Sequence, residues 1–84
     1  MPPAMRARVF ITPKKGVLDP QGKAIEHSLH ALGFGEAHDV HLGKYVELSL
    51  ADVDAGRARQ RVDDMCRRLL ANGVIEDYRF DIEE

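Results

Sequence analysis

Apolar residues alternate with polar ones along three stretches of the chain, and in two further stretches they recur at helical spacing. A period of two predicts half-buried strands, and a spacing of three and four residues predicts amphipathic helices. The strand residues are Ala7, Val9 and Ile11, then Val46, Leu48 and Leu50, and finally Val74, Tyr78, Phe80 and Ile82. The helical residues are Ile25, Leu29 and Leu32, then Ala58, Val62, Met65, Cys66 and Leu69. The order β-α-β-α-β predicts an α+β fold, a small antiparallel sheet with two helices on one face.

The central stretch carries its apolar residues on even numbers from Val40 to Leu50. A two-residue hairpin turn at Gly43-Lys44 would move the buried face from even to odd numbers, because opposed residues share a sheet face. No such switch occurs, so we predict one long, bent strand over 37–50 with Gly43 as a bulge or kink. A three-residue turn over 43–45 would also preserve the parity, and it would give a compact ferredoxin-like β-α-β-β-α-β monomer.

The length of this strand is the first indication of self-association. Roughly 14 residues at about 3.3 Å each span about 46 Å, whereas a globule of this size has a diameter of about 30 Å. The far end of the strand therefore needs a partner outside its own domain, and a second copy of the chain is the simplest one. We predict a ferredoxin-like variant that is completed by dimerisation.

Capping residues define the ends of the two helices. Asp19 is a typical N-cap, and Pro20 suits the first helical position, where its missing N–H costs nothing. Gly33 suits a left-handed helix stop. The second helix is expected over 55–71, capped by Asp52 or Asp54 and ended by Asn72-Gly73. Residues 1–5 are expected to form a flexible tail of a single domain covering 1–84, with either Met1 or Met5 as the start.

Composition excludes several classes of function. The chain has 84 residues, 44% hydrophobic and 31% charged, with a net charge of −2. This charge does not favour nucleic acid or an anionic membrane, and no apolar run is long enough to span a bilayer. One cysteine excludes an internal disulfide and fits the reducing cytoplasm.

The residue types that carry chemistry do not assemble into a catalytic pattern. His27 and His30 flank the apolar stripe of the first helix, and His38 and His41 lie in or near the long strand. Without a metal-binding frame, these histidines are interpreted as solvated or interfacial. Cys66 lies on a buried helix face, where a thiol is a small hydrophobe rather than a nucleophile.

Two features have no simple structural explanation within one chain. Phe10, Tyr45 and Ile75 are bulky residues on the strand faces opposite the core, which should be polar in a sheet covered on one side only. Gln21-Gly22 is a poor choice for the first turn of a helix. We predict that another backbone approaches closely at Gly22.

Several strings resemble the PurS family, the small subunit of phosphoribosylformylglycinamidine synthase. The resemblance runs from about Arg6 to the end of the chain, and Gly73 is its one notable departure, since another residue such as Pro is expected there. The strings are Gly-Val-Leu-Asp-Pro-Gln-Gly (16–22), Leu-Gly-Phe (32–34), Gly-Lys-Tyr-Val-Glu-Leu (43–48), Met-Cys (65–66) and Leu-Leu-Ala-Asn-Gly-Val-Ile-Glu-Asp-Tyr (69–78).

The resemblance implies a non-catalytic subunit in purine biosynthesis. It would join a PurL-type synthetase to a PurQ-type glutaminase, so that glutamine-derived ammonia and ATP convert formylglycinamide ribonucleotide to formylglycinamidine ribonucleotide. ATP and Mg would bind to the synthetase, and this chain would form a cytoplasmic dimer or tetramer without a cofactor of its own. The candidate interface residues are Phe10, Lys15, Asp19, Gln21, Gly22, Gly43, Lys44, Tyr45, Asn72, Ile75 and Glu76.

Two alternatives remain open at this point. A stand-alone homodimeric sensor of ferredoxin-like type would bind an amino acid or a nucleotide without either partner. A small enzyme that uses His27 and His30, or Cys66, would be active as an isolated chain.

Overall fold

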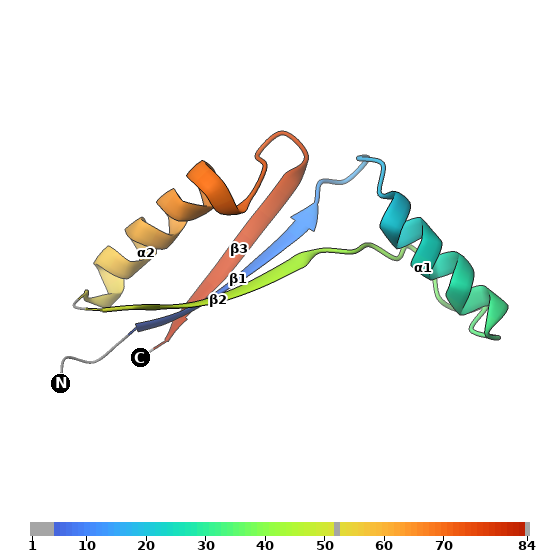
Figure 1. Ribbon diagram of the computed structural model, residues 1–84, viewed down its shortest axis with the longest axis horizontal. Helices are drawn as coiled ribbons and strands as arrows, with labels where there is room; N and C mark the ends of the chain where they lie inside the picture. The colour runs from blue at the N-terminus through green and yellow to red at the C-terminus, as the bar shows by residue number, and fades with distance from the viewer. Residues whose placement is uncertain (1–4, 52, 84) are drawn as a thin grey trace.

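The computed structural model describes residues 5–51 and 53–83, which form a three-stranded antiparallel sheet, two α-helices and one π-helical turn. Figure 1 shows the strands side by side in the order β2-β1-β3. The elements are β1 (Met5–Pro13), α1 (Pro20–Ala31), β2 (Lys44–Leu50), α2 (Ala55–Met65), the π-helical turn η1 (Cys66–Leu70) and β3 (Glu76–Glu83). The α+β class and the order β-α-β-α-β are therefore confirmed.

The alternation of apolar residues identifies the buried face of the sheet correctly. Met5, Ala7, Val9 and Ile11 of β1 are buried, and β1 lies between the other two strands. Its register places Val9 opposite both Val46 and Phe80, so the inner faces of all three strands form one surface. The predicted tail lies outside the described residues except for Met5, which is wrongly included in it because this residue is paired with Leu50 and buried.

The second helix covers this surface over β1 and β3. Asp54 is its N-cap and accepts a hydrogen bond from Arg57 N at 2.8 Å, whereas Asp52 lies outside the described residues. Ala58, Val62 and Cys66 are buried as predicted. Burial raises the pKa of the Cys66 thiol, which fits its role as a packed apolar group.

A π-helical turn corrects the prediction for the end of this helix. Ala71 N donates to Cys66 O at 2.9 Å, an i to i+5 bond that makes the last turn wider than an α-helical one. The next residue to face the core after Cys66 is therefore Leu70, which packs against the core cluster. Leu69, which the α-helical spacing places inside, is 82% exposed.

The first helix does not lie on the sheet, and this part of the fold prediction is wrong for the single chain. Figure 1 shows α1 beyond the end of the sheet, beside the segment that leads into β2. Its predicted ends are confirmed: Asp19 caps the first turn by accepting from Gly22 N, and Gly33 has a φ of +99°. Phe34 N donates to Leu29 O at 2.9 Å and so closes the helix end.

The central strand is shorter than predicted and contains no turn. Its pairing with β1 runs from Leu50 to Lys44, so a reversal at 43–45 is excluded. A Cβ atom on Gly43 would collide with the Ile11 carbonyl oxygen, and at this glycine the chain leaves the sheet. Residues 40–43, which connect the α1 region to β2, do not belong to a strand. Asp39, just before them, has a left-handed φ of +56°. The predicted long, bent strand over 37–50 is therefore wrong, because only Lys44–Leu50 is a strand.

The last strand also begins later than predicted. The chain makes a turn after Asn72, with Ile75 N and Glu76 N both donating to Asn72 O. Val74 and Ile75 lie in this turn, and Val74 is 82% exposed. The placement of Val74 in the core and of Ile75 on the outer sheet face is therefore wrong.

The resulting molecule is elongated. Its principal extents are 51 × 26 × 14 Å and its radius of gyration is 16.5 Å, against about 12 Å for a compact domain of this length. The excess length comes from α1 and its neighbouring segment (Figure 1).

Candidate functional site

Residues 17–43 form a unit that we call the arm, in which α1 and the returning segment 37–42 are held together by polar contacts. His30 Nε2 lies 2.7 Å from Ala37 O, and Glu26 accepts a hydrogen bond from Val40 N at 3.0 Å. The bond from Val40 N lowers the pKa of Glu26, because it stabilises the carboxylate form. The segment is thus attached along the helix rather than lying loosely beside it.

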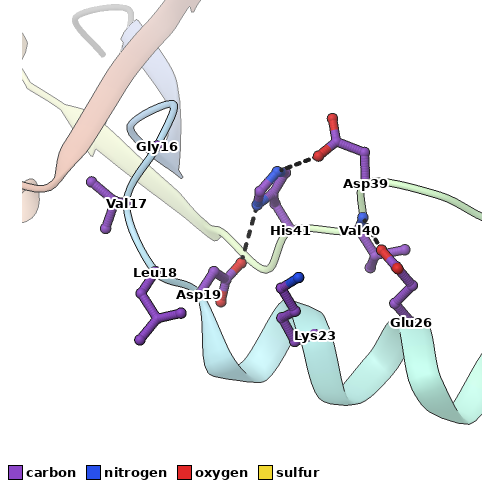
Figure 2. Close-up of a pocket in the computed structure, with 9 residues that line it drawn as sticks. All are labelled: Gly16, Val17, Leu18, Asp19, Lys23, Glu26, Asp39, Val40 and His41. Atoms are coloured by element: carbon purple, nitrogen blue, oxygen red, sulfur yellow. Dashed lines mark hydrogen bonds and ion pairs between the residues drawn. The ribbon is translucent and has the colours of Figure 1, made fainter.

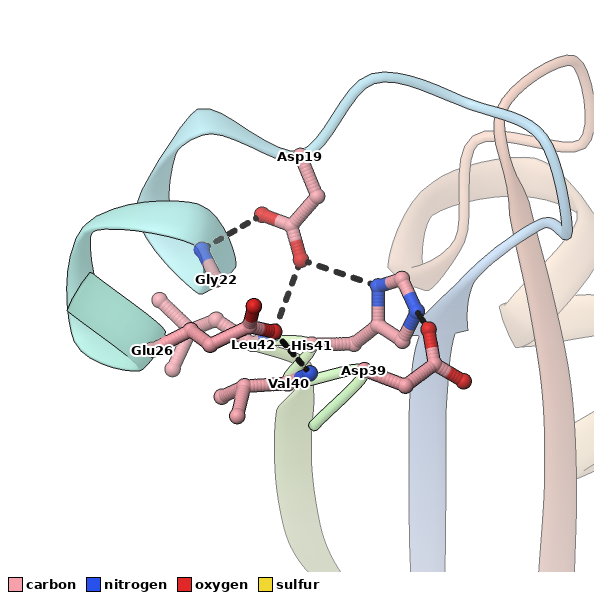
Figure 3. Close-up of polar contacts among 7 residues, drawn as sticks. All are labelled: Asp19, Gly22, Glu26, Asp39, Val40, His41 and Leu42. Atoms are coloured by element: carbon pink, nitrogen blue, oxygen red, sulfur yellow. Dashed lines mark hydrogen bonds and ion pairs between the residues drawn. The ribbon is translucent and has the colours of Figure 1, made fainter. Parts of the chain in front are cut away.

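Asp19 is the residue on which the base of the arm converges. Its Oδ1 accepts from Gly22 N at 3.0 Å, and its Oδ2 accepts from Leu42 N at 2.9 Å (Figure 3). The side chain is only 10% exposed. The backbone N–H groups of Gly22 and Leu42 hold the pKa of Asp19 below its ordinary value. Asp19 therefore joins the start of the helix to the end of the returning segment.

Gly22 has the close backbone approach that the sequence predicts. A Cβ atom on Gly22 would lie 2.9 Å from His41 Cα, and it would collide with the Val40 carbonyl oxygen and the Asp19 carboxylate. Gly22 is also the one buried residue of α1. A glycine is required here because the returning backbone crosses the helix at this position.

His41 was not predicted as part of this site. Its Nδ1 lies 3.4 Å from Asp19 Oδ2 and its Nε2 lies 3.0 Å from Asp39 Oδ1. Figure 3 shows the ring between these two carboxylates. The histidine is half exposed, as predicted, but it is not free. Asp39 and His41 are only two positions apart in the sequence, and this proximity of a carboxylate and an imidazole is the signal that would have indicated the contact.

A crevice of about 440 Å³ lies between the loop 16–19, the first turns of α1 and residues 39–41 (Figure 2). Lys23 and Glu26 contribute to its walls together with Asp19, Asp39 and His41. Most of these polar groups already bond to one another or to the backbone, as described above. The polar groups that line the crevice therefore mainly hold the arm together.

A second group of predicted residues meets at the end of the sheet. Glu76 accepts from Asn72 N at 2.8 Å, and the Lys44 ammonium lies 3.4 Å from the same carboxylate. The Asn72 N–H lowers the pKa of Glu76, with Lys44 as a smaller contribution. Gly43 precedes Lys44 at this point, so four predicted residues lie together. They fix the turn before β3.

Phe10 and Tyr45 lie on the open face of the sheet, as predicted, with ring centroids 5.1 Å apart. Arg79, which the sequence analysis missed, places its guanidinium 4.1 Å from the Phe10 centroid. Tyr45 donates to Glu47 at 2.7 Å, and this carboxylate raises the pKa of the Tyr45 phenol. This mixed aromatic and charged patch has the composition of a protein interface.

The remaining candidates are dispersed. Lys15 and Gln21 are exposed near the base of the arm, and Ile75 is 44% exposed in the turn before β3. The structure does not bring these three into one surface with Phe10 and Tyr45.

The largest unexpected feature is apolar surface on the arm. The stripe of α1 that the sequence predicts as buried is open, with Ile25 38% exposed and Leu32 74% exposed. Leu18, Phe34 and Leu42 are exposed nearby in the chain. Exposed large apolar side chains in this number on one arm indicate an interaction site.

Neither a metal site nor a membrane span is found in residues 5–51 and 53–83. No group of three or more histidine, cysteine or acidic side chains is placed to hold a metal ion there. No helix in the same part of the chain is long and apolar enough to cross a membrane.

Comparisons with known proteins agree with the resemblance found in the sequence. The family model described as PurS, phosphoribosylformylglycinamidine (FGAM) synthase, matches residues 6–84. The PurS subunit of this synthase from Bacillus subtilis is 46% identical over 79 residues, which cover 94% of this chain and 93% of the relative.

Solved structures show the same fold. A crystal structure of Bacillus subtilis PurS has a TM-score of 0.81 at 45% identity and covers 95% of this chain and 99% of that one. A chain in the structure of PurLQS from Thermotoga maritima has a TM-score of 0.87 at 26% identity, covering 96% and 99%. The fold of this chain is thus shared by proteins with this description.

Proposed function

Because this chain belongs to the PurS family and is a subunit of phosphoribosylformylglycinamidine synthase (EC 6.3.5.3) in purine biosynthesis, we propose that it bridges two catalytic subunits without catalysing a step itself. The partners are a PurL-type synthetase and a PurQ-type glutaminase, as in the PurLQS assembly from Thermotoga maritima. The complex would work in the cytoplasm, with ATP and Mg bound by the synthetase. The observation that carries the proposal is the arm, because its exposed apolar face requires a protein partner.

We further propose that the first partner of the arm is a second copy of the chain. The sheet has an apolar area that no helix of the same chain covers. The second helix, α2, lies over β1 and β3, so the inner-face residues of β2 are only partly buried. These residues are Val46, Leu48 and Leu50. Half of one sheet face lacks a helix, and one apolar helix lacks a sheet. Two copies can satisfy both needs if each arm covers the β2 half of the other.

The edges of the sheet support the same geometry. The strand order makes β2 and β3 the two edges. Edge strands are protected by charged side chains, and β3 carries Asp77, Arg79 and Asp81 on its outer face. On the N-terminal side of β2, residues 40–43 continue the backbone and have no neighbouring strand. Antiparallel pairing of two such strands about a two-fold axis near Gly43 would join the sheets and carry each arm to the partner.

The mass of the isolated chain in solution tests the dimer. Sedimentation equilibrium should give a multiple of the 9.4 kDa chain mass. Leu32→Lys removes an apolar contact that a two-fold interface contains twice, about 3 kcal/mol in all, so the dissociation constant of the dimer should rise about 100-fold. His27→Lys adds the same charge at an exposed polar position and should leave the mass unchanged. A wild-type monomer at micromolar concentration would refute self-association.

Reconstitution tests the bridging role. The chain, mixed with the synthetase and the glutaminase, should restore synthesis of formylglycinamidine ribonucleotide from glutamine. Ammonium chloride in place of glutamine should make synthesis much less dependent on the chain, because no transfer between subunits is then needed. Equal glutamine-dependent rates with and without the chain would end the proposal.

The crevice in the arm gives little support to the alternative of a small-ligand sensor. Asp19, Glu26 and Asp39 are already bonded to backbone N–H groups or to His41. A ligand would have to break these contacts to find polar partners. Titration of the isolated chain with amino acids and nucleotides should therefore give no heat of binding.

A further inference from the structure

His41 occupies a position in which its charge decides how many contacts it makes. Its two ring nitrogens face two different carboxylates, Asp19 at 3.4 Å and Asp39 at 3.0 Å (Figure 3). A neutral imidazole has one N–H donor and one lone pair, whereas an imidazolium has two donors. The neutral ring can therefore satisfy only one carboxylate and presents a lone pair to the other. The charged ring binds both.

Further charged groups line the crevice beside the imidazole. The groups that face the crevice from α1 are Lys23 and Glu26, so three carboxylates and one ammonium line the crevice together with the imidazole. Asp19 is held in its ionised form by two backbone N–H groups, and its side chain is 90% buried. Asp19, the more buried of the two carboxylates that face the ring, is therefore an anion near neutral pH.

The backbone of the segment depends on the same contact. Asp39 has a φ of +56°, a conformation that costs free energy for a residue other than glycine. This conformation turns the Asp39 carboxylate towards His41, and the chain then continues through Val40 to Leu42, whose N–H groups bond to Glu26 and Asp19. The histidine is thus the contact between the strained residue and the base of the arm.

We propose that His41 is a pH-sensitive latch, which clamps residues 39–42 onto α1 when the imidazole is protonated and loosens them when it is neutral. Imidazoles change charge between pH 5 and 8. Because only the protonated ring can donate to both carboxylates, the latch stabilises the fold on the acid side. That contribution disappears as the pH rises.

Three variants measured by thermal unfolding between pH 5.5 and 8.0, at equal protein concentration, test the latch. His41→Arg supplies a permanent cation, and His41→Gln supplies none. At pH 5.5 the wild-type Tm should equal that of His41→Arg, and at pH 8.0 it should approach that of His41→Gln. The Tm difference between wild type and His41→Gln should therefore shrink by about 3 °C over this range. His27→Gln removes an exposed histidine outside the crevice and should keep the wild-type profile. A wild-type Tm that stays parallel to His41→Gln over the whole range would refute the latch.

A second measurement keeps the proposal testable if the arginine variant does not fold. Amide hydrogen exchange at Val40 and Leu42 of the wild-type protein reports opening of the segment directly. After correction for the intrinsic effect of pH, protection at both amides should fall several-fold from pH 5.5 to 8.0. Constant protection at Val40 and Leu42 would overturn the proposal.

Discussion

Replacement of Gly22 by alanine should destabilise the protein, although the same change normally favours a helix. Glycine to alanine in a helix gains up to about 1 kcal/mol. At Gly22 the added methyl would lie 2.9 Å from His41 Cα and would collide with the Val40 carbonyl oxygen. Both contacts are with backbone, which cannot rotate away. Overpacking of this kind costs about 1–3 kcal/mol, so after the full helix gain the net loss should be up to about 2 kcal/mol, before any loss of the hydrogen bonds that hold residues 40–42.

Gly56 provides the matched control. It also lies in the first turn of a helix, but a Cβ atom there would meet only the Asp54 carboxylate at 3.5 Å, an ordinary contact. Gly56→Ala should therefore raise the free energy of unfolding by up to about 1 kcal/mol. Urea unfolding followed by circular dichroism at pH 7 and equal concentration measures both variants. A Gly22→Ala protein as stable as Gly56→Ala would show that the arm is not packed on this glycine.

Three further substitutions and titrations test the interior and the polar contacts. Cys66→Ala leaves a small cavity under α2 and should lower the free energy of unfolding by about 1–2 kcal/mol, yet a reconstituted complex should keep its activity; lost activity in a stable variant would contradict this. Asp19 has a lowered pKa because Gly22 and Leu42 donate to it, so its contribution is present near neutral pH and is lost on acidification below the ordinary value of 3.8. The Tm gap between wild type and Asp19→Asn should close in acid, and a constant gap would refute this. Both tyrosines donate to carboxylates, Tyr45 to Glu47 and Tyr78 to Asp63, which raises the pKa of each phenol. Absorbance at alkaline pH should therefore give midpoints above 10, and a lower midpoint would show that these bonds are absent.

Local sequence patterns predicted the features that depend on neighbouring residues. Alternation identified the inner face of β1 and β2, since each side chain's direction follows from the strand period alone. The Asp19-Pro20 cap and the Gly33 stop depend on backbone groups within one turn of helix. Gly22 was predicted as a close approach because Gln21-Gly22 opposes helix propensity, and such a conflict within a well-capped helix indicates a packing requirement.

Features that depend on distant contacts were not predictable in the same way. An apolar stripe shows that α1 must be covered, but it contains no information about whether the cover lies in the same chain. The π-helical turn at Cys66 rotates Leu69 outwards and Leu70 inwards, and consecutive leucines fit either geometry. Arg79 reaches Phe10 only because the register pairs β1 with β3 at these two residues. The strand pairing had to be known first.

The mismatch between pattern and single chain is itself evidence about assembly. The even-numbered apolar residues continue through Val40 and Leu42, beyond the point where β2 leaves its own sheet. Within one chain this alternation does not build a buried sheet face, because Leu42 is 43% exposed and residues 40–43 have no strand beside them. If two copies pair about Gly43, the same residues continue the inner face of the partner's sheet, beneath the arm that they belong to. The alternation therefore matches the joined sheet of the proposed dimer, and this explains why α1 lacks a sheet in one chain.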